Sequence, residues 1–148
     1  MNFIKATIKD AEEICNNNID MALESENTHL SSEVALDAVK NLINDPTKGF
    51  YLLVKKDKKI LGQLMITYEW SDWRNSTIWW IQSVYVLPSN RKIGVFKKLY
   101  DEVKRLANEN CIEVIRLYVF NENYKAIKAY ESIGMKKKPY LIFETSNK

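Results

Sequence analysis

The chain has 148 residues, of which 46% are hydrophobic, so it can bury the core of one domain, and we expect a single domain spanning residues 1–148. Its net charge of +3 is small, which weighs against DNA or RNA as the main partner. Cys15, Cys111 and the single His29 form no metal-binding pattern, and no run approaches the roughly 18 consecutive apolar residues of a membrane span, so we expect no metal, no membrane association and a soluble, cytoplasmic protein.

The N-terminal part of the chain predicts a short strand followed by two helices. Residues 3–6 are expected to form the strand. Asp10, with Glu13 three residues later, has the form of a capping box that opens the first helix. The second helix is expected to begin at residues 31–32 and to end where the Asn-Asp-Pro sequence at residues 44–46 stops it.

The rest of the chain alternates between strand and helix patterns. Two β-rich runs predict an antiparallel hairpin, a third long strand ends at Pro88, and a helical period begins at Ser89. The expected elements are strands 50–55, 59–70 and 77–87, a helix from 89 to before 108, a strand 112–119, a helix 123–133 and a last strand 140–144. This order predicts an α+β or mixed α/β fold in three layers.

The junction between the third long strand and the following helix has the composition of an anion site. Gly94 lies in the first turn of the expected helix, where a glycine costs about 1 kcal/mol relative to alanine, so a ligand is expected to approach the backbone there. Unpaired amides and the helix dipole attract anions at such a turn. Four positive charges surround it: Arg91, Lys92, Lys97 and Lys98. The predicted ligand is a phosphate or diphosphate; alternatively, Gly94 relieves packing against the sheet and the lysines keep an exposed helix soluble.

This junction resembles motif A of the GNAT acetyltransferases, in which a strand leads into Gln/Arg-x-x-Gly-x-Gly/Ala and an apolar helix. Here the motif reads Arg91-x-x-Gly94-x-Phe96, so a bulky ring replaces the final small residue. Backbone amides do not depend on that side chain, and binding can persist if the Phe96 ring turns into the core.

A second segment, Asn123-x-x-Ala126-x-x-x-Tyr130-x-x-x-Gly134-Met135, resembles motif B of the same superfamily. In that motif the Asn touches the pantetheine arm and the Tyr lies near the thioester sulfur. The resemblance covers nearly the whole chain in element order. It implies the GNAT acyl-CoA N-acyltransferase fold, with a central, mostly antiparallel sheet flanked by helices.

The resemblance implies an N-acetyltransferase that uses acetyl-CoA as co-substrate and transfers the acetyl group to a primary amine by direct attack in a ternary complex. The pantetheine arm would enter a gap between strands 80–86 and 112–119, where a backbone amide can stabilise the oxyanion. Tyr130 would act as the general acid for the departing thiolate, with ordinary helix packing as the alternative. The residues expected to bind acetyl-CoA are Val84, Tyr85, Val86, Arg91, Lys92, Ile93, Gly94, Val95, Phe96, Lys97, Asn123 and Tyr130.

The reaction needs a general base, because a lysine-like amine is neutral only about once in 10³ molecules at neutral pH. Several family members carry a Glu where this chain has Gln82, which cannot accept the proton. Glu69 is the best candidate for a catalytic base, since an aromatic cluster beside it would make the carboxylate more basic; a salt bridge with Arg74 or a nearby Lys is the alternative. Weaker candidates are Asp72, Glu24 and Glu26.

An acidic, aromatic pocket is expected to hold the acceptor. Its proposed contacts are Glu26, Trp70, Asp72 and Gln82. Trp79 and Trp80 point to opposite faces of one strand, so at least one of them belongs to the core. Segments 69–74 and 79–84 resemble one branch of the superfamily. A small-molecule or peptide amine is the expected acceptor, and the sequence leaves a homodimer open.

Two other functions stay open. Gln82 and Phe96 would also fit a GNAT-fold module that binds CoA for regulation and has lost transfer activity. The lysine clusters at 55–59 and 136–138 would fit a domain that binds nucleic acid or another acidic partner, although solvated turns are the simpler explanation.

Overall fold

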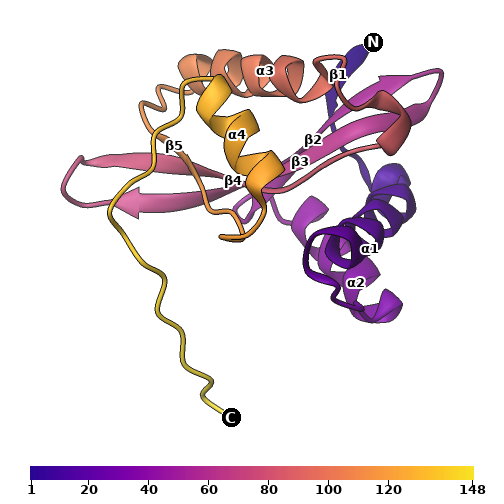
Figure 1. Ribbon diagram of the computed structural model, residues 1–148, viewed down its shortest axis with the longest axis horizontal. Helices are drawn as coiled ribbons and strands as arrows, with labels where there is room; N and C mark the ends of the chain where they lie inside the picture. The colour runs from indigo at the N-terminus through magenta and orange to yellow at the C-terminus, as the bar shows by residue number, and fades with distance from the viewer.

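Five strands form one sheet in the computed structural model, which describes residues 1–148 (Figure 1). The strands are β1 (Asn2–Lys5), β2 (Gly49–Lys56), β3 (Lys59–Ser71), β4 (Ser76–Val86) and β5 (Ile115–Leu117). They lie side by side in sequence order, antiparallel from β1 to β4, and β5 pairs parallel with β4. The helices are α1 (Ala11–Glu26), α2 (Ser32–Ile43), α3 (Val95–Glu109) and α4 (Tyr124–Ser132), with short 3₁₀ turns η1 (Ile8–Asp10) and η2 (Pro88–Asn90). None of the helices combines the length and apolar composition that crossing a bilayer requires.

Side-chain bonds fasten the start of α1 to the sheet. The capping box is formed by Thr7 and Asp10, one turn before the predicted Asp10 and Glu13 pair, because the Asp10 carboxylate accepts the Thr7 backbone N–H at 2.8 Å. Asp10 also pairs with Lys55 of β2. Glu13 instead accepts the backbone N–H of Ile60 on β3 at 2.7 Å. The predicted box was therefore wrong, and Glu13 connects the helix to the sheet.

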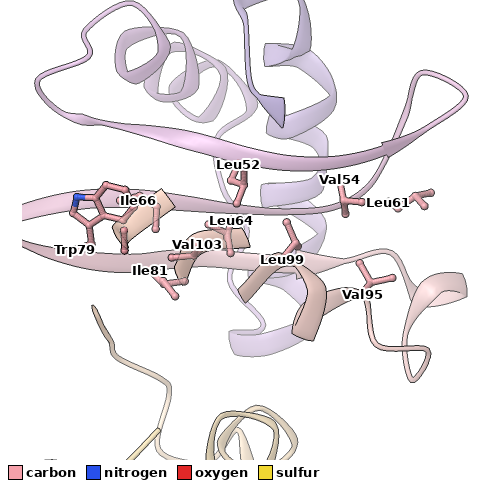
Figure 2. Close-up of a cluster of buried hydrophobic side chains, with 11 residues drawn as sticks. Leu52, Val54, Leu61, Leu64, Ile66, Trp79, Ile81, Val95, Leu99 and Val103 are labelled. Carbon is pink, nitrogen blue, oxygen red and sulfur yellow. The ribbon is translucent and has the colours of Figure 1, made fainter. Parts of the chain in front are cut away.

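The alternation of side chains along β2 and β3 divides the apolar core between the two faces of the sheet. One face packs against α3 through Leu52, Val54, Leu64, Ile66, Val95, Leu99 and Val103 (Figure 2). The opposite face packs against α1 and α2 through Ile14, Val39, Tyr51, Leu53 and Ile60. The sheet is thus the middle of three layers (Figure 1), which confirms the predicted α+β architecture.

A buried polar side chain, that of Gln63 on β3, positions α1 over the sheet. Its Oε1 accepts a hydrogen bond from Asn17 Nδ2 at 2.8 Å. Its Nε2 donates to Asn18 Oδ1 at 3.0 Å and to the carbonyl of Ile14 at 3.4 Å. Because a buried amide without partners is costly, this satisfied network favours one position of α1 on the sheet.

The helix predicted from Ser89 begins at Val95. The 3₁₀ turn η2 and a loop with left-handed residues at Lys92 (φ 65°) and Gly94 (φ 84°) precede it. Gly94 is therefore the residue before the helix, and the prediction that it lies inside the first turn is wrong.

The C-terminal part of the chain also departs from the prediction. Of the expected strand 112–119, only residues 115–117 pair with β4. The expected strand 140–144 does not form, because this segment pairs with no other strand and runs away from the sheet and helices (Figure 1). Tyr140 lies near Arg116 of β5, yet the segment does not pair with the free edge of that strand.

Candidate active site

β4 and β5 pair along only three residues and then separate, which opens a cleft between them. The pairs are Trp79 with Ile115, Trp80 with Arg116 and Ile81 with Leu117. Beyond them β4 continues to Val86 with a bulge against β3, where Ser83 adopts a left-handed φ of 53°. A bulge bends its strand, so it accounts for the divergence of β4 from β5. The predicted gap between these two strands is confirmed.

The cleft has a volume of about 210 Å³ and is bounded by β4, the end of β5 and the loop after it, the end of α1, and α4. Its lining residues are Met21, Ser25, Glu26, Ile81, Gln82, Ser83, Val84, Leu117, Tyr118, Val119, Phe120, Asn123 and Tyr130. Of the predicted site residues, it brings together Glu26, Gln82, Val84, Asn123 and Tyr130. A slot lined by both apolar and polar groups suits an extended ligand such as a pantetheine arm.

The turn that follows β4 presents a row of unpaired backbone N–H groups. From Lys92 to Lys97 no amide donates to a backbone carbonyl, and the first to do so is that of Lys98, which donates to Gly94 at 3.1 Å. Amides in a turn with left-handed residues converge on anions, and the N-terminus of α3 adds the positive end of its dipole. The turn therefore fits the predicted diphosphate.

Two glycines shape this turn in different ways. A methyl group on Gly94 would meet no atom within 4 Å, so the alternative that Gly94 relieves packing against the sheet is wrong. Its role is conformational, because a φ of 84° strains any other residue. The close approach occurs at Gly62 of β3, where a Cβ would lie 3.1 Å from Val95 Cγ1 and 3.2 Å from Leu99 Cδ1. Gly62 thus lets the start of α3 pack directly on β3.

The Arg91 guanidinium is bonded to other groups of the protein. Its two terminal nitrogens each lie 3.1 Å from the Glu24 carboxylate, and its Nε donates to the Val86 carbonyl at 2.8 Å. The hydrogen bond from Arg91 lowers the pKa of Glu24. Burial and the neighbouring Glu24 raise the pKa of Tyr85 to about 12, so Tyr85 faces this ion pair with its proton retained. Arg91 therefore links the turn to the end of α1.

The other predicted ligands of the turn contribute mainly through the backbone. The Lys97 ammonium pairs with Asp101 at 2.9 Å. The Val95 side chain is buried in the core, so only the backbone amide of Val95 is available to a ligand. Lys92 and Ile93 are exposed.

The Phe96 ring on α3 packs against Tyr130 of α4. It meets Tyr130 edge-on, with centroids 5.5 Å apart at 65°, and lies 6.3 Å from the Tyr100 ring. Phe96 is half-buried and lies outside both core clusters. Burial raises the pKa of Tyr130, so its phenol keeps its proton at neutral pH.

Asn123 has a structural role as well as a place in the cleft. Its Oδ1 accepts the backbone N–H of Ala126 at 3.3 Å and so caps α4. This bond fixes the start of α4, the helix that carries Tyr130 into the cleft.

Gln82 is fixed in the cleft by two neighbours. Its Nε2 donates to Thr67 Oγ1 at 2.6 Å, and its Oε1 accepts from the Tyr118 hydroxyl at 3.4 Å.

Sequence reasoning missed Tyr118 and Ser83 as cleft residues. An alternating strand pattern could have indicated Tyr118, whereas nothing in a serine indicates a positive φ.

Glu69 lies outside the cleft. Its Oε1 accepts the indole N–H of Trp80 at 2.8 Å, and its Oε2 lies 3.6 Å from Arg116. It lines a separate hollow on the β3–β4 hairpin together with Trp70, Asp72 and Arg116. The four residues predicted to contact the acceptor therefore divide between two places, with Glu26 and Gln82 in the cleft. Trp79 is buried on the α3 face and Trp80 reaches Glu69 on the other, as the strand alternation predicted.

The model of the acetyltransferase (GNAT) family matches residues 12–135, which include the cleft and the turn. The chain therefore belongs to the GNAT family and is an acetyltransferase. It is 29% identical over 117 residues to acetyltransferase PseH of Campylobacter jejuni subsp. jejuni serotype O:2, covering 78% of this chain and 68% of PseH.

Two solved structures share this fold. A possible acetyltransferase from Clostridium difficile 630 is 37% identical, with a TM-score of 0.91 over 98% of this chain and 96% of that one. A predicted acetyltransferase from Clostridium acetobutylicum, solved with acetyl-CoA, is 15% identical with a TM-score of 0.81, covering 97% of this chain and 95% of that one. At this identity the second comparison shows a shared fold.

Proposed function

We propose that the protein uses acetyl-CoA as co-substrate and transfers the acetyl group to the primary amine of a small molecule or peptide by direct attack. The observation that carries this proposal is the row of free amides from Lys92 to Lys97, placed where β4 leaves the cleft. A diphosphate on this turn and an arm along β4 would together deliver a thioester to the cleft. The acetyl-CoA in the Clostridium acetobutylicum structure, which has the same fold, supports this ligand.

The chain's own groups match each part of such a ligand. The amides and the unpaired Lys92 bind the diphosphate, while the apolar cleft wall excludes water from the arm. A backbone N–H of β4 beyond Ile81, where pairing with β5 ends, would stabilise the oxyanion. That step requires no side chain.

Glu26 is the carboxylate that lines the cleft, and we assign it the proton of the attacking amine, taken directly or through water. Glu69, the first candidate from the sequence, is bonded to Trp80 and Arg116 in the neighbouring hollow. It is the weaker candidate, because a base must reach the proton that it removes.

Tyr130 lines the cleft with a protonated phenol, and we assign it the hydrogen bond to the departing sulfur. A phenol with a raised pKa keeps this proton well into the alkaline range. Its contact with Phe96 holds the ring in place from the first turn of α3.

Calorimetric titration with acetyl-CoA, followed by assays of CoA thiol release with a panel of amines, tests the proposal. We expect saturable binding and amine-dependent release. Binding without release from any amine would indicate the regulatory module instead, and no binding would refute the proposed diphosphate site.

Two matched substitutions distinguish the candidate bases. Glu26→Gln should lower kcat/KM by about 10² at neutral pH, and the loss should shrink as rising pH deprotonates the amine. Glu69→Gln serves as the control and should retain most activity. The reverse outcome would restore Glu69 as the base.

Tyr130→Phe should lower kcat while the acetyl-CoA affinity stays unchanged.

A further inference from the structure

The last turn of α1 forms part of the cleft wall, but it is not packed into the core. Met21, Ser25 and Glu26 line the cleft from this part of the helix. The buried residues of α1 all lie in its first half: Ala11, Ile14, Cys15 and Asn17. A helix end without buried side chains opens locally at low cost. The position of this wall therefore depends on its hydrogen bonds and ion pairs.

One side chain connects the end of α1 to the rest of the fold by polar contacts. Among residues 19–26, only Glu24 forms a hydrogen bond or an ion pair with another element. Each of its carboxylate oxygens lies 3.1 Å from a terminal nitrogen of Arg91, and the Tyr85 hydroxyl bonds to the same carboxylate. The Arg91 guanidinium also lies 5.3 Å from the Tyr85 ring. These three side chains form one cluster between α1, β4 and the diphosphate turn.

The geometry of this cluster suits a contact that fixes position. The Arg91 and Glu24 side chains are 41% and 43% exposed, and a single exposed ion pair contributes little to stability. A bidentate pair, however, fixes orientation as well as distance. Both partners of this pair are also held elsewhere, since Arg91 Nε donates to the Val86 carbonyl at 2.8 Å and Tyr85 is buried. The guanidinium is thus bonded to α1 and to β4 before any ligand binds.

We infer that Arg91 and Glu24 are positioning residues for the acceptor: their ion pair holds the last turn of α1, and with it Glu26, against the cleft. The diphosphate is then bound by the backbone amides of the turn and by Lys92, without the Arg91 side chain. This inference rests on the proposed placement of the acceptor amine beside Glu26. Because Arg91 directly precedes the free amides that begin at Lys92, the ion pair also connects the two substrate sites. A ligand that orders the turn should therefore order the end of α1.

Glu24→Gln and Arg91→Gln remove the ion pair and test the inference by steady-state kinetics, with an amine that the wild-type enzyme acetylates and with saturating acetyl-CoA. We expect kcat/KM for the amine to fall by about 10- to 100-fold, because misplacing a reacting group by roughly 1 Å can cost 10² in rate. The Kd for acetyl-CoA, measured by calorimetry, should stay close to the wild-type value. The double variant should lose no more than the more impaired single variant, since the two side chains act as one pair.

Two further variants serve as comparisons. Lys92→Gln removes a charge from the diphosphate site and should show the opposite order, with a larger loss of acetyl-CoA affinity than of kcat/KM for the amine. Arg105→Gln is the matched control, since Arg105 also forms exposed ion pairs, with Glu102 and Glu109, but within α3. It should resemble the wild type in both measurements.

The possible outcomes separate this inference from the proposed function. Arg91→Gln with as large a loss of acetyl-CoA affinity as Lys92→Gln, or Glu24→Gln with wild-type kinetics toward the amine, would overturn the inference and leave the proposed function intact. A wild-type protein that binds no acetyl-CoA, or acetylates no amine, would refute the proposed function and this inference with it.

Hydrogen exchange tests the connection between the two sites without an acceptor. ADP carries a diphosphate but no pantetheine arm, so it can occupy the turn and leave the cleft free. At an ADP concentration that slows exchange of the amides in the turn, we expect exchange in residues 21–26 of α1 to slow in the wild type and not in Glu24→Gln. Protection of the turn alone in the wild type, or equal protection of residues 21–26 in both proteins, would contradict the proposed connection.

Discussion

Substituting Gly94 by alanine tests the proposed diphosphate site most directly. The added methyl group meets no atom within 4 Å, so the substitution creates no clash, and its cost comes from the φ of 84° alone. A left-handed conformation costs a non-glycine residue about 1–2 kcal/mol. For a domain of this size that corresponds to a fall in Tm of roughly 2–8 °C if the turn keeps its shape.

If the turn instead relaxes, its amides lose their orientation. A hydrogen bond to a charged group contributes about 1.5–3 kcal/mol, so losing even one raises the Kd for acetyl-CoA roughly 10- to 150-fold. We therefore expect Gly94→Ala to weaken acetyl-CoA binding by at least this factor while the fold is retained.

Gly134 supplies a matched control. It too is left-handed, with φ 94°, and an added Cβ there meets nothing within 4 Å, but it follows α4 and not the diphosphate turn. Gly134→Ala should show a similar loss of Tm with unchanged acetyl-CoA affinity. Calorimetry and thermal denaturation of both variants provide the comparison. Equal affinities for acetyl-CoA in the two variants, without the fall in Tm that a turn of unchanged shape requires in Gly94→Ala, would refute the assignment of the turn.

Three further predictions concern side-chain contacts that hold the helices in place. Phe96→Ala removes the edge-on contact with Tyr130, which contributes about 0.5–1.5 kcal/mol beyond area burial. The value of kcat, measured by steady-state kinetics, should therefore fall more than the acetyl-CoA affinity measured by calorimetry. Gln63→Ala leaves the buried Asn17 amide without its acceptor and should lower the free energy of unfolding by about 1–3 kcal/mol or more in urea denaturation; an unchanged midpoint would contradict this role. Burial alone would raise the pKa of Asp10, but hydrogen bonds from Lys55 and Thr7 outweigh burial and lower the pKa. The ionised Asp10 therefore stabilises the fold fully when the pH is above the ordinary carboxyl pKa. This stabilisation is lost as the pH falls through the lowered pKa. Asp10→Asn should therefore be less stable at neutral pH and lose less of its Tm on acidification, which thermal melts across the acid range would measure.

Much of the site could be predicted because it depends on the backbone. Gly94 and the strand before it indicated a turn with free amides, and the resemblance of the segment from Asn123 to Tyr130 to motif B implied a helix at the cleft. Neither inference required knowledge of distant partners. The same holds for the two core faces, which follow from the alternation of side chains along β2 and β3.

The side-chain partners could not be predicted, since they come from segments far apart in the chain. Arg91 carries a charge suited to a phosphate, yet its partner Glu24 lies 67 residues away. Glu69 is paired with Arg116, a residue of another strand, instead of the neighbouring Arg74. The alternative of a salt bridge was therefore right in kind and wrong in partner. Residues 140–144 have strand propensity, but propensity does not say whether the segment pairs with a neighbouring edge.

The two walls of the cleft differ in how firmly they are held. β4 lies inside the sheet with Ile78, Trp79, Ile81 and Tyr85 buried, whereas α4 has no buried residue. Local opening is easiest where few apolar contacts must break, so backbone amide hydrogens of α4 should exchange with solvent faster than those of β4. A molecule bridging both walls would slow exchange in α4 and leave β4 nearly unchanged. Hydrogen exchange along α4 would then report how full the cleft is, with β4 as the internal reference.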